Sequence, residues 1–156
     1  MKRLKLLSSL FVLLLVVIPS LALKAEAPGS IGVQSDDREK AEMVVKIIYL
    51  AKVDSKAGKF EEALNLLDTA IEVITQKEYR EKLQIEVADV HLWWAVNLKR
   101  KYDFPGAIKH FEIAYAIDKN YRPKVAAIAL NNIGFLYDTL GQTQKALEYH
   151  EKAISR

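Results

Sequence analysis

The chain has 156 residues, of which 51% are apolar and 28% are charged. This composition predicts one domain with a substantial buried core, and it excludes a disordered or collagen-like chain. Cysteine is absent from the sequence, so disulfide bonds, thiolate metal sites and thiol catalysis are excluded. The 23 Lys and Arg residues exceed the 20 Asp and Glu residues by three, and the pI is near 9.0.

The amino terminus has the pattern of a secretory signal peptide. Basic residues in the first five positions precede an uncharged apolar stretch over residues 6–18, and Pro19 follows it. Small side chains at Ser20 and Ala22 predict cleavage after Ala22. We therefore expect residues 1–22 to be a signal peptide and the protein to be exported, either to a periplasm or out of the cell. The alternative is an uncleaved membrane anchor over residues 6–23.

The charge balance changes if residues 1–22 are removed. Lys2, Arg3 and Lys5 account for the whole excess, so the remaining chain would carry 20 basic against 20 acidic residues. The basic pI then describes the export signal rather than the folded domain. Residues 23–37 are rich in Pro, Gly, Ser and Asp without periodicity, and they predict a flexible leader.

From residue 38 onward the pattern predicts an all-α domain, residues 38–156. Apolar residues recur at steps of three and four, which is typical of amphipathic helices. Pro123 suits the first turn of a helix, where its missing donor costs nothing. The expected helices span residues 38–57, 60–76, 79–101, 104–118, 122–140 and 143–154.

Small residues repeat at a fixed spacing along this domain. Ala51, Ala63 and Ala70 are separated by 12 and then 7 residues, and two later sets repeat these steps: Ala95, Ala107, Ala114, and Gly134, Ala146, Ala153. Two helices joined by a tight turn approach closely only where both present small side chains. The spacing therefore predicts three antiparallel helix hairpins. Gly58 and Gly141 are expected to end the first helix of the first and third hairpins, and Tyr102 stands at the corresponding place in the second.

The third copy, ALNNIGFLYDTLGQTQKALEYHEKAI over residues 129–154, resembles the tetratricopeptide repeat family. Its Gly134, Tyr137, Ala146 and Ala153 match the family pattern, with His150 at a position where an aromatic ring is usual. The resemblance implies a right-handed superhelical array of about three repeats, approximately residues 44–77, 88–121 and 127–156. The copies lie 44 and then 39 residues apart, longer than the usual 34, which resembles the kinesin-light-chain type and long-repeat bacterial members.

By the same resemblance, the first helix of each repeat lines a concave groove that binds partners. Counting the first small residue of each copy as position eight assigns twelve groove residues. They are Tyr49, Lys52, Lys56, Asp89, Trp93, Val96, Arg100, Asn131, Asn132, Phe135, Asp138 and Thr139. Asn amides can bond the main chain of an extended peptide, Trp93 and Phe135 offer apolar contact, and Lys52, Lys56 and Arg100 are suited to an acidic group.

The sequence offers little for catalysis. His91, His110 and His150 fall at different repeat positions, so no two of them are expected to converge. His150-Glu151 begins like a zinc-protease helix, but Ile154 stands where the second ligand belongs. No Gly-rich phosphate loop joins a strand to a helix in the predicted pattern. We therefore expect neither an enzyme nor a cofactor.

The favoured function is an exported, non-enzymatic adaptor that binds a protein or peptide in its groove. Two alternatives are a regulatory or sensor arm of a larger protein whose effector domain is missing, and a membrane-tethered assembly factor. Nucleic-acid binding is disfavoured, because no basic stripe with interleaved aromatic residues occurs. The last helix is predicted to expose parts of Leu147, Tyr149 and Ile154, and self-association through it is a further expectation.

Overall fold

The computed structural model describes residues 32–155, with side chains from residue 37 onward. Residues 37–156 form one compact unit, which contains nearly all described residues. The predicted signal peptide, residues 1–22, and residues 23–31 of the predicted leader lie outside the described residues. In the part of the chain that is described, no helix is both long and apolar enough to cross a membrane.

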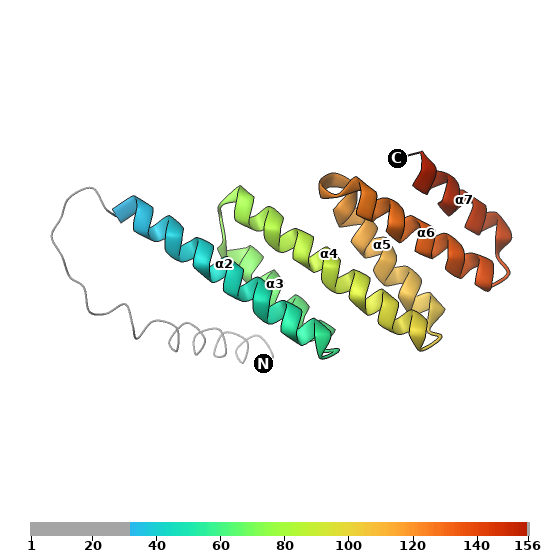
Figure 1. The fold of residues 1–156 in the computed structure, drawn as a ribbon, viewed down its shortest axis with the longest axis horizontal. Coiled ribbons are helices and arrows are strands. Elements are labelled where there is room, and N and C mark those ends of the chain that lie inside the picture. Colours follow the sequence, from blue (N-terminus) through green and yellow to red (C-terminus); the bar gives the residue numbers. More distant parts are fainter. Residues whose placement is uncertain (1–31, 156) are drawn as a thin grey trace. The chain divides into compact units, whose positions relative to one another are not determined.

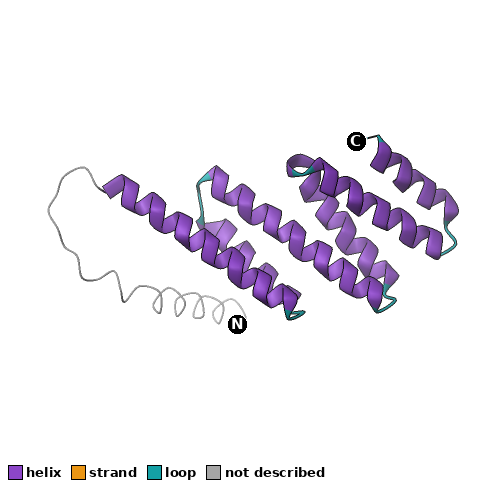
Figure 2. Cartoon of the chain, in the orientation of Figure 1, coloured by secondary structure: helices purple, strands orange, loops and turns teal. Residues whose placement is uncertain are grey.

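The described residues form six helices and no strand (Figure 2). Their bounds are α2 Gly32–Lys56, α3 Phe60–Val73, α4 Lys77–Arg100, α5 Phe104–Tyr121, α6 Pro123–Thr139 and α7 Thr143–Ile154. The all-α prediction is confirmed, and most helix ends lie within three residues of the predicted ones.

The start of the first helix differs from the prediction. Residues 32–37 were expected in the flexible leader, but α2 begins at Gly32, six residues before the predicted residue 38. Between residues 33 and 56 the sequence holds no Pro or Gly that would interrupt a helix. Because residues 32–37 lack hydrophobic periodicity, the sequence pattern gave no sign that the helix extends through them.

The helices pair as three hairpins, α2 with α3, α4 with α5, and α6 with α7. Figure 1 shows α2, α4 and α6 running in the same direction, with α3 and α5 behind them. Successive elements pack in chain order, α3 on α4, α5 on α6 and α6 on α7. Two clusters of buried side chains hold the hairpins together, one around Leu67 and Leu83 and one around Phe111 and Ile133.

The repeated small residues lie inside these hairpins. Each of the nine is buried, from Ala51 with no exposed surface to Ala153 with 8%. Their burial is the reason that the two helices of a hairpin can approach closely, because a larger side chain at any of these positions would push them apart. The spacing of small residues therefore predicted the hairpins correctly.

All three hairpin turns end their first helix in the same way. Gly58, Tyr102 and Gly141 have positive φ values of 79°, 62° and 72°. In each turn the amide of the following residue donates to a carbonyl five residues back, as from Asp103 to Leu98 at 3.0 Å, which defines a Schellman motif. Tyr102 adopts the left-handed conformation that glycine adopts in the other two turns, although its side chain disfavours it.

Candidate interaction surface

Six large apolar side chains are exposed on the first helices of the hairpins. They are Val45, Tyr49, Val53, Trp93, Ile128 and Phe135, with 45% to 68% of their surface accessible. A single exposed apolar residue is ordinary in a folded protein, whereas a group on neighbouring helices typically marks an interaction site. We call the exposed surface of α2 from residue 37, α4 and α6 the first-helix face.

Val45 and Ile128 were not among the predicted groove residues. Both stand at the second position of their repeats, by the same count that selected Asp89 in the second copy. The repeat register was therefore sufficient to find them. They widen the apolar part of the first-helix face beyond its aromatic residues.

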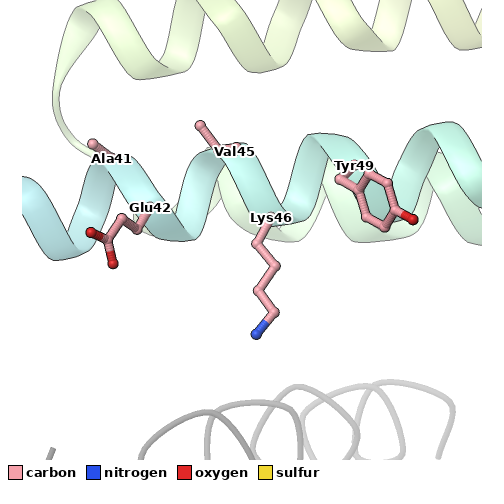
Figure 3. A pocket seen from close by; sticks show the side chains of 5 residues that line it. All are labelled: Ala41, Glu42, Val45, Lys46 and Tyr49. Carbon is pink, nitrogen blue, oxygen red and sulfur yellow. The ribbon is translucent and has the colours of Figure 1, made fainter.

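A hollow lies on α2 at the amino-terminal end of this face, and Figure 3 draws the side chains that line it. Its described lining residues are Ala41, Glu42, Val45, Lys46 and Tyr49. The apolar Val45 and the aromatic Tyr49 lie one helical turn apart along α2, and Lys46 is the one charged residue between them in sequence. The hollow extends the first-helix face but adds no group suited to catalysis.

Lys52, which was predicted to hold an acidic partner, is already paired within the fold. Its Nζ lies 3.3 Å from Oε2 of Glu86 on α4, whose side chain is buried. Burial raises the pKa of Glu86, and the ammonium of Lys52 opposes this rise. Since removal of Lys52 would leave a buried carboxylate without its counter-ion, this lysine joins α2 to α4.

Asp89, another predicted groove residue, is paired as well. Its Oδ1 accepts a hydrogen bond of 2.7 Å from Arg122, which also donates to Asp118. Burial opposes the charge of Arg122, but its bonds to Asp89 and Asp118 raise its pKa above the ordinary value. The guanidinium thus joins α4 to the end of α5 and the start of α6, and the carboxylate of Asp89 is neutralised.

Lys99 belongs to the first-helix face, although it was not predicted. Its Nζ donates to Oδ1 of Asn132 at 3.1 Å and lies 5.8 Å above the ring centre of Phe135. The other end of the Asn132 amide donates to the carbonyl of Ile128 at 3.0 Å. Lys99 therefore connects α4 with α6 and holds two predicted groove residues in place.

The remaining predicted groove residues fall into two groups. Val96 packs against the second core cluster, Asn131 contacts the ring of His150 at 3.2 Å, and Thr139 donates to the carbonyl of Phe135. These residues mainly support the fold. In contrast, Lys56, Arg100 and Asp138 are exposed, and no described carboxylate lies within ion-pair distance of Lys56 or Arg100.

The expectation that no two histidines converge is wrong. Nδ1 of His91 on α4 lies 2.8 Å from Nδ1 of His110 on α5. The two residues occupy different repeat positions, but they face each other across one hairpin, because His91 precedes Ala95 by four residues and His110 follows Ala107 by three. Comparison of repeat positions along single helices could not reveal a contact between antiparallel helices.

Aromatic rings enclose this histidine pair. The ring of Trp94 stacks on His110 at 4.1 Å between centres, and Phe60 stacks on the same indole at 5.4 Å. Burial, together with the neighbouring His110, lowers the pKa of His91 to about 4. Burial also lowers the pKa of His110; Lys109 acts in the same direction and Asp103 opposes it. The pair is therefore neutral at neutral pH, with one N–H donating to the other ring.

The described residues offer no cluster of side chains suited to a metal ion. They contain no group of three or more His, Asp or Glu side chains that could hold an ion. The two histidine rings meet edge to edge at hydrogen-bond distance, which leaves no room for an ion between their Nδ1 atoms.

The chain resembles known proteins in sequence and in fold. A tetratricopeptide repeat model matches residues 86–156. No curated protein matches the sequence. Among solved structures, the tetratricopeptide repeat domain of Arabidopsis FLU is 20% identical with a TM-score of 0.46, covering 75% of this chain and 96% of that one. The crystal structure of MamA is 14% identical with a TM-score of 0.40, covering 83% of this chain and 95% of that one.

Proposed function

Because the chain belongs, through residues 86–156, to the tetratricopeptide repeat family, we propose that it is an exported adaptor that binds a protein partner across its first-helix face. Arrays of this kind generally act as scaffolds for protein–protein interaction. The export, the use of this particular face and the absence of an enzymatic activity are parts of the proposal.

The observation that carries the proposal is the row of exposed rings on the first helices. Tyr49, Trp93 and Phe135 come from three successive hairpins, and each is more than half exposed. Keeping such rings in water has no benefit for folding, whereas aromatic residues are the usual anchors of protein interfaces. Lys99, which lies over Phe135, holds part of this surface in a fixed arrangement before a partner binds.

The second helices lack a comparable row. In α3 and α5, exposed positions are mostly charged or small, as at Glu61, Glu62 and Lys109. The large apolar side chains that are exposed on the second helices are Val73 on α3 and Leu147 and Ile154 on α7. The first helices expose more of them, including three aromatic rings. The ion pairs of Lys52 with Glu86 and of Asp89 with Arg122 connect neighbouring helices and help to keep the first-helix face rigid.

The amino-terminal sequence supports the export part of the proposal. A basic start, an apolar stretch over residues 6–18 and small residues before Leu23 form a signal-peptide pattern. We expect the mature protein to begin at Leu23 and to be recovered outside the cytoplasm. A mass measurement on the protein isolated from cells tests this directly. An intact amino terminus in the membrane fraction would support the tethered alternative instead.

A capture experiment tests the use of the first-helix face. The tagged chain is cross-linked in its own compartment, and captured proteins are compared for the wild type, Trp93→Ala and Leu147→Ala. Leu147 is also an apolar residue with more than half of its surface exposed, but it lies on α7. We expect the specific partner to be lost with Trp93→Ala and kept with Leu147→Ala. The reverse result would assign binding to α7 and contradict the proposal.

A further inference from the structure

Every second helix carries an apolar residue directly after each of its two repeated small residues. These apolar residues are Leu64, Ile71, Ile108, Tyr115, Leu147 and Ile154. In α3 and α5 they pack into the two core clusters, and α3 packs on α4 as α5 packs on α6. They therefore form the side of each hairpin that meets the first helix of the next hairpin.

On α7 the same two positions are exposed. Leu147 has 52% and Ile154 has 85% of its surface accessible, whereas Ile108 on α5 has 7%. Glu151, also exposed, stands four residues after Leu147 and three before Ile154, so the three side chains share one side of the helix. We call Leu147, Glu151 and Ile154 the α7 outer face. It has the apolar residues of an internal contact, but no described helix covers them.

The first helix α2 has the complementary surface. In α4 and α6, positions three and ten hold Val90 and Leu136, which are 1% and 0% exposed. The same positions on α2 hold Lys46 and Val53, both exposed, with the half-buried Leu50 between them. Figure 3 shows Lys46 pointing to the side of α2 opposite α4. We call Lys46, Leu50 and Val53 the α2 outer face.

We propose that the α7 outer face of one copy packs on the α2 outer face of a second copy, so that chains assemble end to end. The two faces are the two halves of a contact that the chain already makes twice, between a second helix and the following first helix. A second copy is therefore the partner whose shape and chemistry fit both faces. Figure 1 shows α2 and α7 as the first and last described helices, so one copy can offer both faces at once. This inference goes beyond the proposed function, because it uses a different surface and does not depend on it.

The contact between α5 and α6 supplies the register. Arg122 is the single residue between these two helices. Tyr115 and Ala129 lie 7 residues on either side of it, and Ile108 and Leu136 lie 14 residues on either side. Because both helices rise equally per residue and run in opposite directions, each of these pairs lies at one level of the contact. All four residues belong to the same core cluster.

The same register in an end-to-end contact places Leu147 against Val53 of the second copy and Ile154 against the alkyl stem of Lys46. Glu151 lies three residues from Ile154, or about 4.5 Å along the helix, so its carboxylate is within reach of the ammonium of Lys46. Among the described residues, neither charged group has an ion-pair partner. The two faces are thus complementary in charge as well as in apolar surface.

Such a contact joins two different faces, so it does not close on itself. Each added copy leaves one α2 outer face and one α7 outer face free, and assembly continues as an open chain. The contact of one helix with one helix is small compared with the interface of a permanent dimer, so we expect a dissociation constant of about 50 µM. Assembly would place the first helices of successive copies beside one another and extend the first-helix face.

The test is sedimentation velocity over a range of concentrations, with the chain as isolated from cells. Four forms are compared: wild type, Val53→Glu, Leu147→Glu and Val73→Glu. Val73 is 60% exposed on α3 and belongs to neither outer face, so its variant controls for an added carboxylate. All three substituted residues are exposed, and circular dichroism verifies that each variant keeps its helices.

We expect the average mass of the wild type to rise with concentration, and the association to weaken at least about tenfold in Val53→Glu and in Leu147→Glu. Val73→Glu should behave as the wild type does. An equimolar mixture of Val53→Glu and Leu147→Glu should recover association but stop at two copies, because each variant keeps one intact face.

A charge exchange tests the register. Lys46→Glu should weaken association about fivefold, and the addition of Glu151→Lys in the same chain should restore it. Equal association in Lys46→Glu and the wild type would contradict the register that places these two charges together.

Four results would overturn end-to-end assembly. They are a single-chain mass up to about 1 mM, undiminished association in Val53→Glu, an equal loss in Val73→Glu, and an equimolar mixture that stays monomeric while the wild type associates. Undiminished association in Val53→Glu with loss in Leu147→Glu would assign the contact to two α7 helices instead.

The Trp93→Ala variant separates this inference from the proposed function. It should lose the captured partner but assemble as the wild type does. Loss of assembly in Trp93→Ala would show that the contact involves the first-helix face near Trp93 and would contradict the two outer faces.

Discussion

The second and third hairpins share the same spacing of small residues, yet they differ in what lies beside those residues. In the second, α4 and α5 enclose the bonded pair of His91 and His110 under the ring of Trp94. In the third, α6 and α7 enclose the stacked rings of Tyr137 and Tyr149, whose centres are 5.4 Å apart. The small residues thus set how closely the helices approach, while the neighbouring positions decide whether the interior responds to pH.

The two hairpins differ in their turns as well. The second forces Tyr102 into a left-handed conformation, whereas the third uses Gly141. The second compensates in part with Asp103, whose carboxylate accepts from the amide of Gly106 at 3.0 Å and caps α5, while no side chain caps α7. The hairpin that carries Trp93 and Arg100 on its surface therefore has the more polar interior and the more strained turn.

The largest expected difference between the hairpins is the effect of acid. The pKa of His91 is lowered in the fold from 6.5 to about 4, so the unfolded chain binds a proton in this range that the folded chain does not. Stability contributed by the neutral pair is complete above pH 6.5 and falls as pH decreases toward 4. With an allowance for partial solvation, we expect the free energy of unfolding to fall by about 2 kcal/mol. Urea unfolding at several pH values measures this.

His91→Gln supplies the matched variant for that prediction. A Gln amide can still donate to Nδ1 of His110 but does not titrate in this range. We expect the variant to be close to wild type at pH 7.5 and to lose most of the decrease between pH 6.5 and 4. If the decrease remains as large in His91→Gln, the pair is not its source.

A smaller effect is expected from the third hairpin, where Gly134 stands at the position that Ala51 and Ala95 occupy in the first two. A Cβ at Gly134 would lie 2.8 Å from Cε1 of His150, closer than such atoms approach in proteins. Gly134→Ala would gain about 1 kcal/mol of helix propensity, but it must displace this ring and break its contact with Asn131. We expect a net loss of about 1 kcal/mol.

A double-mutant cycle identifies the cause of this loss. In the His150→Ala background the ring is gone, so Gly134→Ala should be stabilising there. Thermal unfolding of the four proteins gives the coupling between the two positions. Additive effects would show that Gly134 is needed for a reason other than the ring of His150.

The smallest expected effect concerns the turns. Replacing Tyr102 with glycine should relieve the left-handed strain, less the entropy that glycine adds to the unfolded chain, for a gain of about 0.5 kcal/mol. The converse change Gly141→Ala places a side chain in the same conformation and should cost about 1 kcal/mol. Equal and small changes of unfolding free energy in both would indicate that neither turn is strained.

Much of the fold could be predicted, because its determinants are local in sequence. The step of 12 residues across each turn fixed which helices pair, and the burial of Ala63, Ala107 and Ala146 follows from it. Only α2 began well before its predicted residue, since hydrophobic periodicity gives no sign of a helical segment without an apolar face.

The side-chain pairs could not be predicted in the same way. Whether Lys52 faces Glu86, or Asp89 faces Arg122, depends on the rotation and offset of neighbouring helices, and the repeat pattern does not specify these within one turn. The rings at the groove positions Tyr49, Trp93 and Phe135 are exposed, and their role in binding stays a prediction. The same positions did not reveal which charged residues had partners inside the fold.

The most direct test of the account is to map where a bound partner lies. Amide hydrogen exchange is compared for the isolated protein and for its complex with the partner captured from cells. The account predicts added protection along α2, α4 and α6, centred near Tyr49 and Trp93, with little change in α3 and α5. Protection confined to α7 or to the second helices would contradict it.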